Sequence, residues 1–507
     1  MSSLAGLGAM GLVPAVAEDL NPLGANQVAW QELIDGLGGG VYRYNDPDFA
    51  LKARVNNLRY MRKLPQAVAV IDSAEKAQFA INWCQANRDI PFRIKGGGHS
   101  YAGFSTCEGL VLLTQGLGET RRLGDFMRVA GGAINYDLDD ALAQSQRSIT
   151  HGRCPTVGAA GFVLGGGIGF DMRRYGMACD LLESATLVTA DGQHLTASAS
   201  ENADLFWALR GGAGGNFGLA TSFTFKTFDV AQEHIHAFER FYRIEYNGQN
   251  SIERAANFLH DLMASCEASG DGLGTRISVQ YIKAPIHTGD PDYFQVDFLG
   301  QWAGEDWQNA ARLLAKIDAT AKWLDASVTE KLNFVAGAGH YWQAQQKLSE
   351  PEELYYYQER STFISTSPTA QQIEPALWQL KARPDVSGPC DLRFFQTGGK
   401  INDVAAGDTA FVHRNSQWLA LVGYYWDGGD ARYPALIAQG HEWQNQFYNS
   451  VLLGEQALFS GTGAYQNFPD VSLKNAGAAY YGDNLARLKM VKQKYDPSRL
   501  FNFSQAI

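Results

Sequence analysis

The chain contains 507 residues, of which 45% are hydrophobic, 12% aromatic and only 19% charged. At about 150 residues per domain, this length predicts roughly two to four domains, and the composition is that of a globular protein. With 42 Lys and Arg against 53 Asp and Glu, the formal net charge is −11. Because a surface of this charge repels phosphate groups, nucleic acid is not expected as a partner.

The first 20 residues contain an apolar stretch of small residues that ends in Ala15-Val16-Ala17. This stretch suits cleavage by signal peptidase, but a basic segment before it is missing. Residues 1–20 are therefore a possible signal-peptide remnant, and a loose apolar terminus is the alternative. The first interpretation predicts a periplasmic or secreted protein and the second a cytoplasmic one. No later segment offers about 18 uninterrupted apolar residues, so no membrane span is expected.

The cysteines do not indicate a metal site or a disulfide framework. None of the six belongs to a C-x-x-C pair, the spacing typical of structural zinc. His234 and His236 alternate as on a strand, but no third ligand is evident, so both are expected to be structural and no metal is predicted.

A strand, a helix and a second strand are predicted between residues 67 and 95. Ala67 to Ile71 form a β-rich run, and Asp72 with Glu75 three residues later is typical of a helix start. Asn87 is expected to end the helix before the next strand begins near Pro91. This unit leads directly into a glycine cluster, where backbone amides can surround an anion.

The region from about 230 to 465 is predicted to form one antiparallel sheet with helices on one face. The expected strands cover residues 277–282, 294–299, 392–395 and 419–425, and an amphipathic helix covers 307–323. The other face of such a sheet is free to line a pocket.

Three glycine clusters occur in the first 220 residues, at 96–98, 152–169 and 211–215. A nicotinamide dinucleotide motif requires G-x-G-x-x-G, and the register fails at Phe170 in the second cluster and at Phe217 in the third. A Walker loop fails too, because no Gly-Lys-Ser/Thr follows. For any one Gly-Gly pair, an ordinary turn is the alternative. Three such clusters with polar residues between them favour a common explanation.

Taken with His99 and Cys154, these clusters resemble the FAD-linked oxidases of the vanillyl-alcohol-oxidase superfamily, in the branch of the berberine-bridge enzymes and oligosaccharide oxidases. The resemblance covers nearly the whole chain. The matching stretches are residues 93–101, 152–158, 165–169, 204–212, 480–484, 495–497 and 500–503.

The resemblance implies an α+β fold with a two-part PCMH-type FAD-binding domain and a substrate domain built on a large antiparallel sheet. We expect the FAD-binding domain at residues 21–228, the substrate domain at 229–465, and a return to the FAD-binding domain, as a berberine-bridge-like segment, at 466–507.

The resemblance also implies FAD bound by two covalent links, from His99 to the flavin 8α-methyl and from Cys154 to flavin carbon 6. Arg153 is expected to favour the reactive thiolate of Cys154. Taken alone, Cys154 is typical of a small buried residue and His99 of a loop histidine. The remaining expected cofactor-binding residues are Gly96, Gly97, Gly98, Ser100, Val157, Gly158, Gly161, Gly165, Gly166, Gly167, Gly169 and Asn502.

Oxidation of an alcohol needs a base for the hydroxyl proton while a hydride moves to the flavin. Tyr465 matches the family's catalytic tyrosine, and it needs a cationic neighbour or another partner to lower its pKa. Asp391 stands near the position of an assisting acid, where Arg393 and Gln396 compete for the role and a structural carboxylate is the alternative. Tyr101 matches a tyrosine that faces substrate, and packing on glycine is the alternative.

These residues predict an oxidase that acts on a hydroxyl of a sugar, an oligosaccharide or a glycosylated secondary metabolite, with oxygen as acceptor and hydrogen peroxide as product. Val157 occupies a position where valine admits oxygen in the family, although it also suits simple packing. The apolar run 419–422 replaces a glutamate or glutamine of the berberine-bridge branch, which disfavours alkaloid cyclisation. A dehydrogenase with another acceptor and a catalytically silent flavin-binding or ligand-binding protein are the alternatives.

Aromatic residues of the middle segment are candidates for stacking on sugar rings, and sheet core is the alternative for each of them. They are Tyr341, Trp342, Tyr355, Tyr356 and Tyr357.

Overall fold

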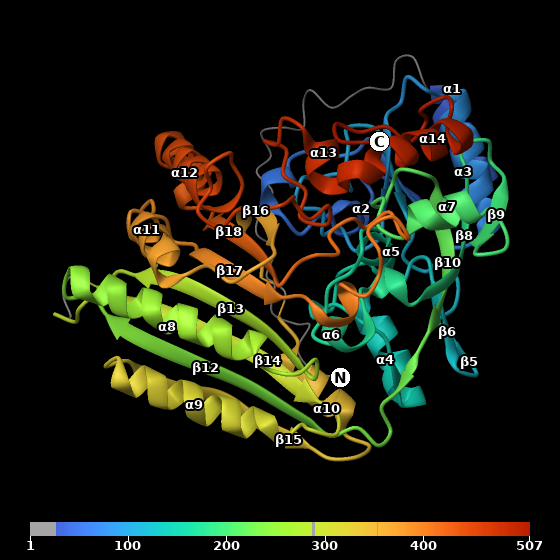
Figure 1. Cartoon of the computed structure of the whole chain (residues 1–507). Helices are drawn as coiled ribbons and strands as arrows, with labels where there is room; N and C mark the ends of the chain where they lie inside the picture. The colour runs from blue at the N-terminus through green and yellow to red at the C-terminus, as the bar shows by residue number, and fades with distance from the viewer. Residues whose placement is uncertain (1–26, 286–288, 352) are drawn as a thin grey trace.

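A computed structural model of the chain describes residues 27–285, 289–351 and 353–507. The possible signal-peptide remnant lies outside the described residues. Figure 1 shows two bodies side by side, a mixed helix and sheet body and a broad sheet with helices on its outer face. Among the helices of the described residues, none is long and apolar enough to cross a membrane.

The first body contains a four-stranded and a five-stranded sheet. The four-stranded sheet has the order β1-β2-β4-β3, and β4 pairs in parallel with β2 and β3. Its strands are β1 (Val41–Arg43), β2 (Ala67–Val70), β3 (Phe92–Lys95) and β4 (Leu110–Leu113). The antiparallel five-stranded sheet comprises β5 (Arg121–Leu123), β6 (Phe126–Ala130), β10 (Leu219–Lys226), β8 (Leu182–Val188) and β9 (His194–Ser198).

The predicted strand-helix-strand unit is present, but its helix starts differently. Helix α3 (Ala74–Ala86) is capped by Ser73, whose hydroxyl accepts the backbone N–H of Lys76, and it ends at Asn87 as expected. The prediction that Asp72 begins the helix is therefore wrong by one residue. Asp72 instead forms an exposed ion pair with Lys76 at 2.8 Å, because the two side chains lie one turn apart.

Short elements complete the first body, and α14 packs against α7. They are α1 (Gln27–Gly36), α2 (Phe49–Ala53), α4 (Asn135–Ser145), α5 (Ala159–Leu164), α6 (Met172–Tyr175), α7 (Ala203–Leu209), α13 (Ala476–Tyr481), α14 (Leu485–Tyr495), and the pair β7 (Arg147–Ser148) with β11 (Phe228–Asp229).

The second body is the predicted antiparallel sheet, with seven strands in the order β15-β12-β14-β13-β17-β18-β16. Helices α8, α9, α11 and α12 cover one face, as Figure 1 shows, and they bury a large apolar core against it. The strands are β12 (Ile235–Glu245), β13 (Leu273–Ile282), β14 (Tyr293–Ala303), β15 (Ser327–Ala336), β16 (Tyr356–Ile364), β17 (Cys390–Gln396) and β18 (Trp418–Trp426). The helices are α8 (Gln249–Glu267), α9 (Asn309–Trp323), α10 (Tyr341–Leu348), α11 (Ala370–Lys381) and α12 (Pro434–Phe447).

The end of the chain packs into the first body through buried polar contacts. The Lys492 ammonium is buried and donates to the carbonyls of Asn216 at 2.6 Å and Phe501 at 2.7 Å. The backbone N–H of Ile507 donates to the Asn216 side chain at 3.0 Å. The carboxyl-terminal segment lies some 290 positions after Asn216 in the sequence, and these contacts hold it against the glycine-rich region.

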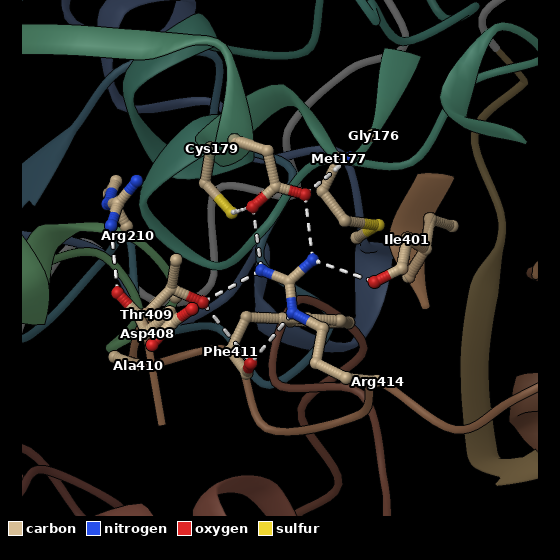
Figure 2. A network of polar contacts seen from close by, with 12 residues as sticks. Gly176, Met177, Cys179, Arg210, Ile401, Asp408, Thr409, Ala410, Phe411 and Arg414 are labelled. Atoms are coloured by element: carbon tan, nitrogen blue, oxygen red, sulfur yellow. Dashed lines mark hydrogen bonds and ion pairs between the residues drawn. The ribbon is translucent and has the colours of Figure 1, made fainter. Parts of the chain in front are cut away.

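A buried ion pair joins the first body to the loop before β18. The Arg414 guanidinium donates to both carboxylate oxygens of Asp180, at 2.6 and 2.7 Å, and to the Thr409 hydroxyl at 2.7 Å. Figure 2 shows Arg414 enclosed by Cys179, Thr409, Phe411 and Ile401. Because both charged groups are out of water, each depends on the other for compensation.

We expect Asp180→Asn to lower the free energy of unfolding by about 3–5 kcal/mol, because it leaves the Arg414 charge buried without a counter-ion. The measurement is the guanidinium unfolding curve of the purified holoprotein, followed by tryptophan fluorescence. Lys400→Ala is the control, since it removes an ion pair whose two side chains are 58% and 61% exposed. Equal unfolding midpoints for the two variants would contradict a stabilising role for the buried pair.

Candidate active site

A cavity of about 750 Å³ lies where the glycine loops meet the free face of the seven-stranded sheet. One part of its wall is backbone from the three glycine clusters, and another part is side chains of β13, β17 and β18. The cavity therefore joins the two bodies of the molecule, with a glycine-rich end and a polar end.

Two glycines bring the first two clusters into direct backbone contact. A Cβ at Gly97 would lie 2.1 Å from the carbonyl oxygen of Thr156 and 2.4 Å from the nitrogen of Gly158. A Cβ at Gly158 would lie 2.5 Å from the nitrogen of Gly97. Real Cβ atoms do not approach other atoms this closely, so both positions require glycine. The contact places His99 and Cys154 on the wall of the same cavity.

Most of the predicted cofactor-binding residues line this cavity, whereas Gly165, Gly166 and Gly167 are not part of its wall. A Cβ at Gly165 would lie 2.0 Å from the Asn467 side chain, so these three glycines serve close packing behind the cavity. The lining members are Gly96, Gly97, Gly98, His99, Ser100, Cys154, Val157, Gly158, Gly161, Gly169 and Asn502.

His99 and Cys154 have different polar partners. The Nε2 atom of His99 lies 2.7 Å from the Thr156 hydroxyl, which orients the ring. The Cys154 thiol lies 3.6 Å from the Glu350 carboxylate. Burial and then the Glu350 charge raise the pKa of Cys154 to about 12, and Arg153 opposes them with a smaller effect. The expectation that Arg153 promotes the thiolate has the right sign but is outweighed.

Glu350 weakens the effect of Arg153 on the pKa of Cys154, because its carboxylate pairs with the Arg153 guanidinium. Its Oε1 atom accepts from Arg153 at 2.7 Å and from Arg276 of β13 at 2.6 Å. Burial alone would raise the pKa of Glu350, but the two guanidinium groups hold it at about 2. Arg276 also pairs with Asp297 of β14. A fixed carboxylate therefore stands beside the Cys154 sulfur.

Tyr465 lines the cavity but is 1% exposed, and its hydroxyl is already engaged. The oxygen accepts the backbone N–H of Gly167 at 2.9 Å and the Asn467 amide at 3.1 Å. Burial raises the pKa of Tyr465 well above its usual value, although these two donors act against the rise. Among the described residues, no Lys or Arg donates to this hydroxyl. Its catalytic role stays a prediction.

Tyr101 lines the cavity, whereas Asp391 lies beneath it. The Tyr101 ring stacks parallel on Phe468 with centroids 4.9 Å apart and meets Tyr357 edge-on at 5.1 Å. Asp391 accepts from Arg393 at 2.9 Å and from the Ser278 hydroxyl at 2.7 Å, and it is not part of the cavity wall. Asp391 therefore orients Arg393, which does line the cavity.

A carboxylate that the sequence did not predict completes the polar end of the cavity, the floor to which β16, β17 and β18 contribute. Glu359 of β16 is 1% exposed, and its Oε1 atom accepts from Arg393 at 3.1 Å and from the Tyr425 hydroxyl of β18. The register of the strands brings the Glu359 and Asp391 carboxylates to the same part of the sheet, because both residues stand opposite Gly423. A Cβ at Gly423 would lie 2.3 Å from Asp391, so the glycine makes room for the acid. Alternation of polar residues along β16 and β17 is the sequence signal that was available.

The aromatic and histidine candidates divide between the cavity and the core. Tyr355 and Tyr357 line the cavity, whereas Tyr356 stacks on Trp426. Tyr341 and Trp342 are buried in an apolar core that residues of both bodies form. His236 contacts the Asn333 side chain at 2.7 Å and His234 stacks on Trp307, so both have structural contacts.

The cavity fits FAD. Its glycine-rich end presents backbone without side chains, as a pyrophosphate requires, and a Cβ at Gly161 would meet no atom within 4 Å. Asn135 lines the same end, and its buried Oδ1 accepts no hydrogen bond from the described residues, so it can accept one from a ligand. The residues that would hold the cofactor are therefore those of the three glycine clusters, with His99 and Cys154.

Two family models match the chain at the places that form the cavity. Residues 65–198 match the FAD binding domain, and residues 464–507 match the berberine and berberine-like domain. The first match contains His99 and Cys154, and the second contains Tyr465 and Asn502.

Curated relatives match along most of their length. The chain is 27% identical to YgaK of Bacillus subtilis, an uncharacterised FAD-linked oxidoreductase, over 93% of this chain and 97% of that protein. It is 26% identical to a xylooligosaccharide oxidase of Thermothelomyces thermophilus, over 87% of each chain.

Solved structures share the fold. A structure of glucooligosaccharide oxidase from Acremonium strictum, described with a 6-S-cysteinyl, 8α-N1-histidyl FAD, superposes with a TM-score of 0.76. It is 24% identical, and the alignment covers 92% of this chain and 97% of that one. The two domain matches, the curated relatives and this fold agree. The chain is thus an FAD-linked oxidoreductase that carries a match to the FAD binding domain at residues 65–198 and a match to the berberine and berberine-like domain at residues 464–507.

Proposed function

We propose that the protein is an FAD-dependent oxidase that takes a hydride from a hydroxyl-bearing carbon of a sugar, an oligosaccharide or a glycosylated secondary metabolite. Oxygen is the electron acceptor and hydrogen peroxide the product. The observation that carries this proposal is the single cavity with a glycine-rich end for the cofactor and a charged, aromatic floor for a polyhydroxylated substrate. A relative named as a xylooligosaccharide oxidase supports a sugar as the substrate.

The cofactor in this proposal is held by two covalent bonds. His99 bonds through its imidazole ring, which the contact of Nε2 with the Thr156 hydroxyl orients. Cys154 bonds through its sulfur from the other loop, and Gly96, Gly97, Gly98 and Ser100 surround the pyrophosphate. The support for both bonds is that the two anchors line one cavity and that a structural neighbour carries this pair of linkages.

Bound FAD supplies the acceptor for the hydride. The chain's own residues bind and orient the sugar. Tyr101 with Phe468 forms an aromatic wall, on which a sugar ring packs through its C–H face. Arg393, held in place by Asp391, presents guanidinium N–H groups to sugar hydroxyls. A substrate hydroxyl can then be directed by hydrogen bonds on one side and by the aromatic wall on the other.

Tyr465 is the base that the family resemblance implies. The donors Gly167 and Asn467 hold its oxygen in place and favour a phenolate, yet burial has the larger effect on its pKa. A role for Tyr465 as proton acceptor therefore requires a compensating cation, and the described residues place none on its hydroxyl. Positioning of the glycine turn at Gly167 is the role that its contacts support.

Val157 lies in the cavity wall beside Cys154, which suits oxygen access to the bound cofactor. The alternatives are a dehydrogenase with another acceptor and a silent binding protein.

Location in the periplasm or outside the cell belongs to the same proposal, and it rests on the possible signal-peptide remnant.

We expect a panel of mono- and oligosaccharides to include at least one that bleaches the enzyme's flavin absorption without oxygen, because the polar floor suits a sugar. Admitting air should restore the absorption and release one hydrogen peroxide for each sugar oxidised. The measurements are anaerobic absorption spectra and peroxide yield.

Two results would separate the alternatives. Bleaching by a sugar with very slow recovery in air would contradict the oxidase and indicate another acceptor. A flavin that no sugar bleaches would contradict the proposed substrate class and favour a silent binding protein.

We expect attachment of FAD to Cys154 to accelerate about tenfold for each unit of pH above neutral, because a thiol with a pKa of about 12 gains thiolate in that proportion. Glu350→Gln should speed attachment at neutral pH, since it removes the charge that raises the pKa and leaves Arg153 to lower it. The measurement is adduct mass against time after FAD is added to the apoprotein.

Glu353→Gln is the matched control, since it removes a carboxylate from the same cavity wall. Slower attachment in Glu350→Gln than in the wild type would contradict this account, and it would mean that Glu350 takes the thiol proton.

A further inference from the structure

We propose that the proton of the substrate hydroxyl leaves through Tyr425 to Glu359, a relay on the floor of the cavity. Tyr425 is then a catalytic residue that touches substrate, and Glu359 acts through it as a positioning residue and final proton acceptor. The inference deepens the proposed function and rests on it. Neither residue belongs to the stretches that carry the family resemblance.

The geometry sets the order of the relay. Tyr425 and Arg393 line the cavity, whereas Glu359 does not and lies behind them. The Tyr425 hydroxyl donates to Oε1 of Glu359, and Arg393 donates to the same oxygen at 3.1 Å. A proton that enters at the Tyr425 oxygen thus has a carboxylate directly behind it.

Glu359 has spare capacity to accept a proton. Its Oε2 atom is buried and accepts no hydrogen bond of standard geometry from the described residues. An unsatisfied buried carboxylate oxygen costs stability, so a protein that retains one needs a reason for it. Burial also raises the pKa of Glu359, although Arg393 and the hydrogen-bonding hydroxyls of Tyr425 and Tyr101 act against this rise. A carboxylate with a raised pKa is a better proton acceptor than an ordinary one.

Several groups face Glu359 from the elements packed around it, and they decide its titration. Arg393 favours the charged form, but it is shared with Asp391, to which it lies 2.9 Å away. Asp391 itself disfavours the charged form. The facing groups are Arg393 and Asp391 on β17, Tyr425 on β18, Tyr357 on the same strand and Tyr101 from the first glycine loop.

Tyr357 and Tyr465 of the cavity wall are less suited than Tyr425 to pass on the substrate proton. The Tyr357 hydroxyl donates to the Asn56 amide oxygen at 3.1 Å, which is a weak acceptor for a proton. The Tyr465 oxygen accepts from Gly167 and Asn467, so it needs to become a phenolate in order to act alone. Tyr425 avoids this requirement because it passes its own proton to Glu359 while it receives the substrate proton. Its high pKa is therefore no obstacle.

The relay conserves atoms and electrons. The substrate O–H bond breaks and its proton goes to the Tyr425 oxygen, while the Tyr425 proton goes to Glu359. The substrate C–H bond breaks with its electron pair, which leaves with the hydrogen to the FAD of the proposed function. The C–O bond of the substrate becomes C=O, so the sugar loses two electrons and two hydrogens.

The test uses the purified holoenzyme and a sugar that reduces the wild type. Glu359→Gln and Tyr425→Phe should each slow anaerobic flavin reduction at saturating sugar by roughly 10²–10⁴-fold. Glu359→Gln should also remove the acidic inflection from the pH profile of that rate, and Glu359→Asp should restore part of the rate. The affinity for a deoxy sugar that lacks the reacting hydroxyl should change little, since binding remains.

Tyr448→Phe is the matched control, because it removes a buried tyrosine hydroxyl that donates to the Ser361 carbonyl and lies outside the cavity wall. An infrared spectrum without substrate provides a readout that does not depend on turnover. The carboxylic acid band that appears as the pH is lowered should be weaker in Glu359→Gln than in Tyr448→Phe.

Reduction of Glu359→Gln and Tyr425→Phe as fast as Tyr448→Phe, with an unchanged pH profile, would overturn the relay and leave the proposed function intact. A wild type that no sugar reduces would instead overturn the proposed function, and the relay with it. Circular dichroism and flavin content establish that each variant is folded, and Tyr425→Phe removes only one oxygen atom.

Discussion

The cavity depends on a contact between two stretches of backbone that only glycine permits. Gly97 and Gly158 pack so closely that a side chain at either would overlap the other loop. This contact places His99 and Cys154, 55 positions apart in the chain, on one cavity wall. The first glycine cluster directly follows strand β3, and Gly158 of the second cluster lies at the start of α5, so both contacting stretches present backbone without side chains.

The opposite wall is organised by charge. Carboxylates and guanidinium groups on the free face of the sheet form pairs that cross strands, such as Arg276 with Asp297 and Arg393 with Glu359. Pairing reduces the free-energy cost of burying these charges and fixes the orientation of their side chains. Exposure to water would not fix that orientation. Glu350 extends this order to the first body, because it joins Arg153 beside Cys154 to Arg276 of the sheet.

Local patterns predicted local structure well. The strand-helix-strand unit, the four strands proposed for the middle region and the helix-covered face of its sheet are all present, because alternation and capping act over a few residues. The cap was displaced from Asp72 to Ser73, since neighbouring polar residues compete for one role. Glu359 and Glu350 were missed because their partners lie 34 to 197 positions away, and no short pattern encodes such pairs. The contacts of Tyr465 with Gly167 were hidden for the same reason.

The most direct test of the proposed flavin attachment is the mass of tryptic peptides from the denatured protein. Cleavage after Lys95 and Arg153 releases residues 96–121 with His99 and residues 154–173 with Cys154. We expect the two peptides to be recovered as one coloured species, joined by a single FAD. Recovery of both as separate, colourless peptides with unmodified His99 and Cys154 would contradict the account.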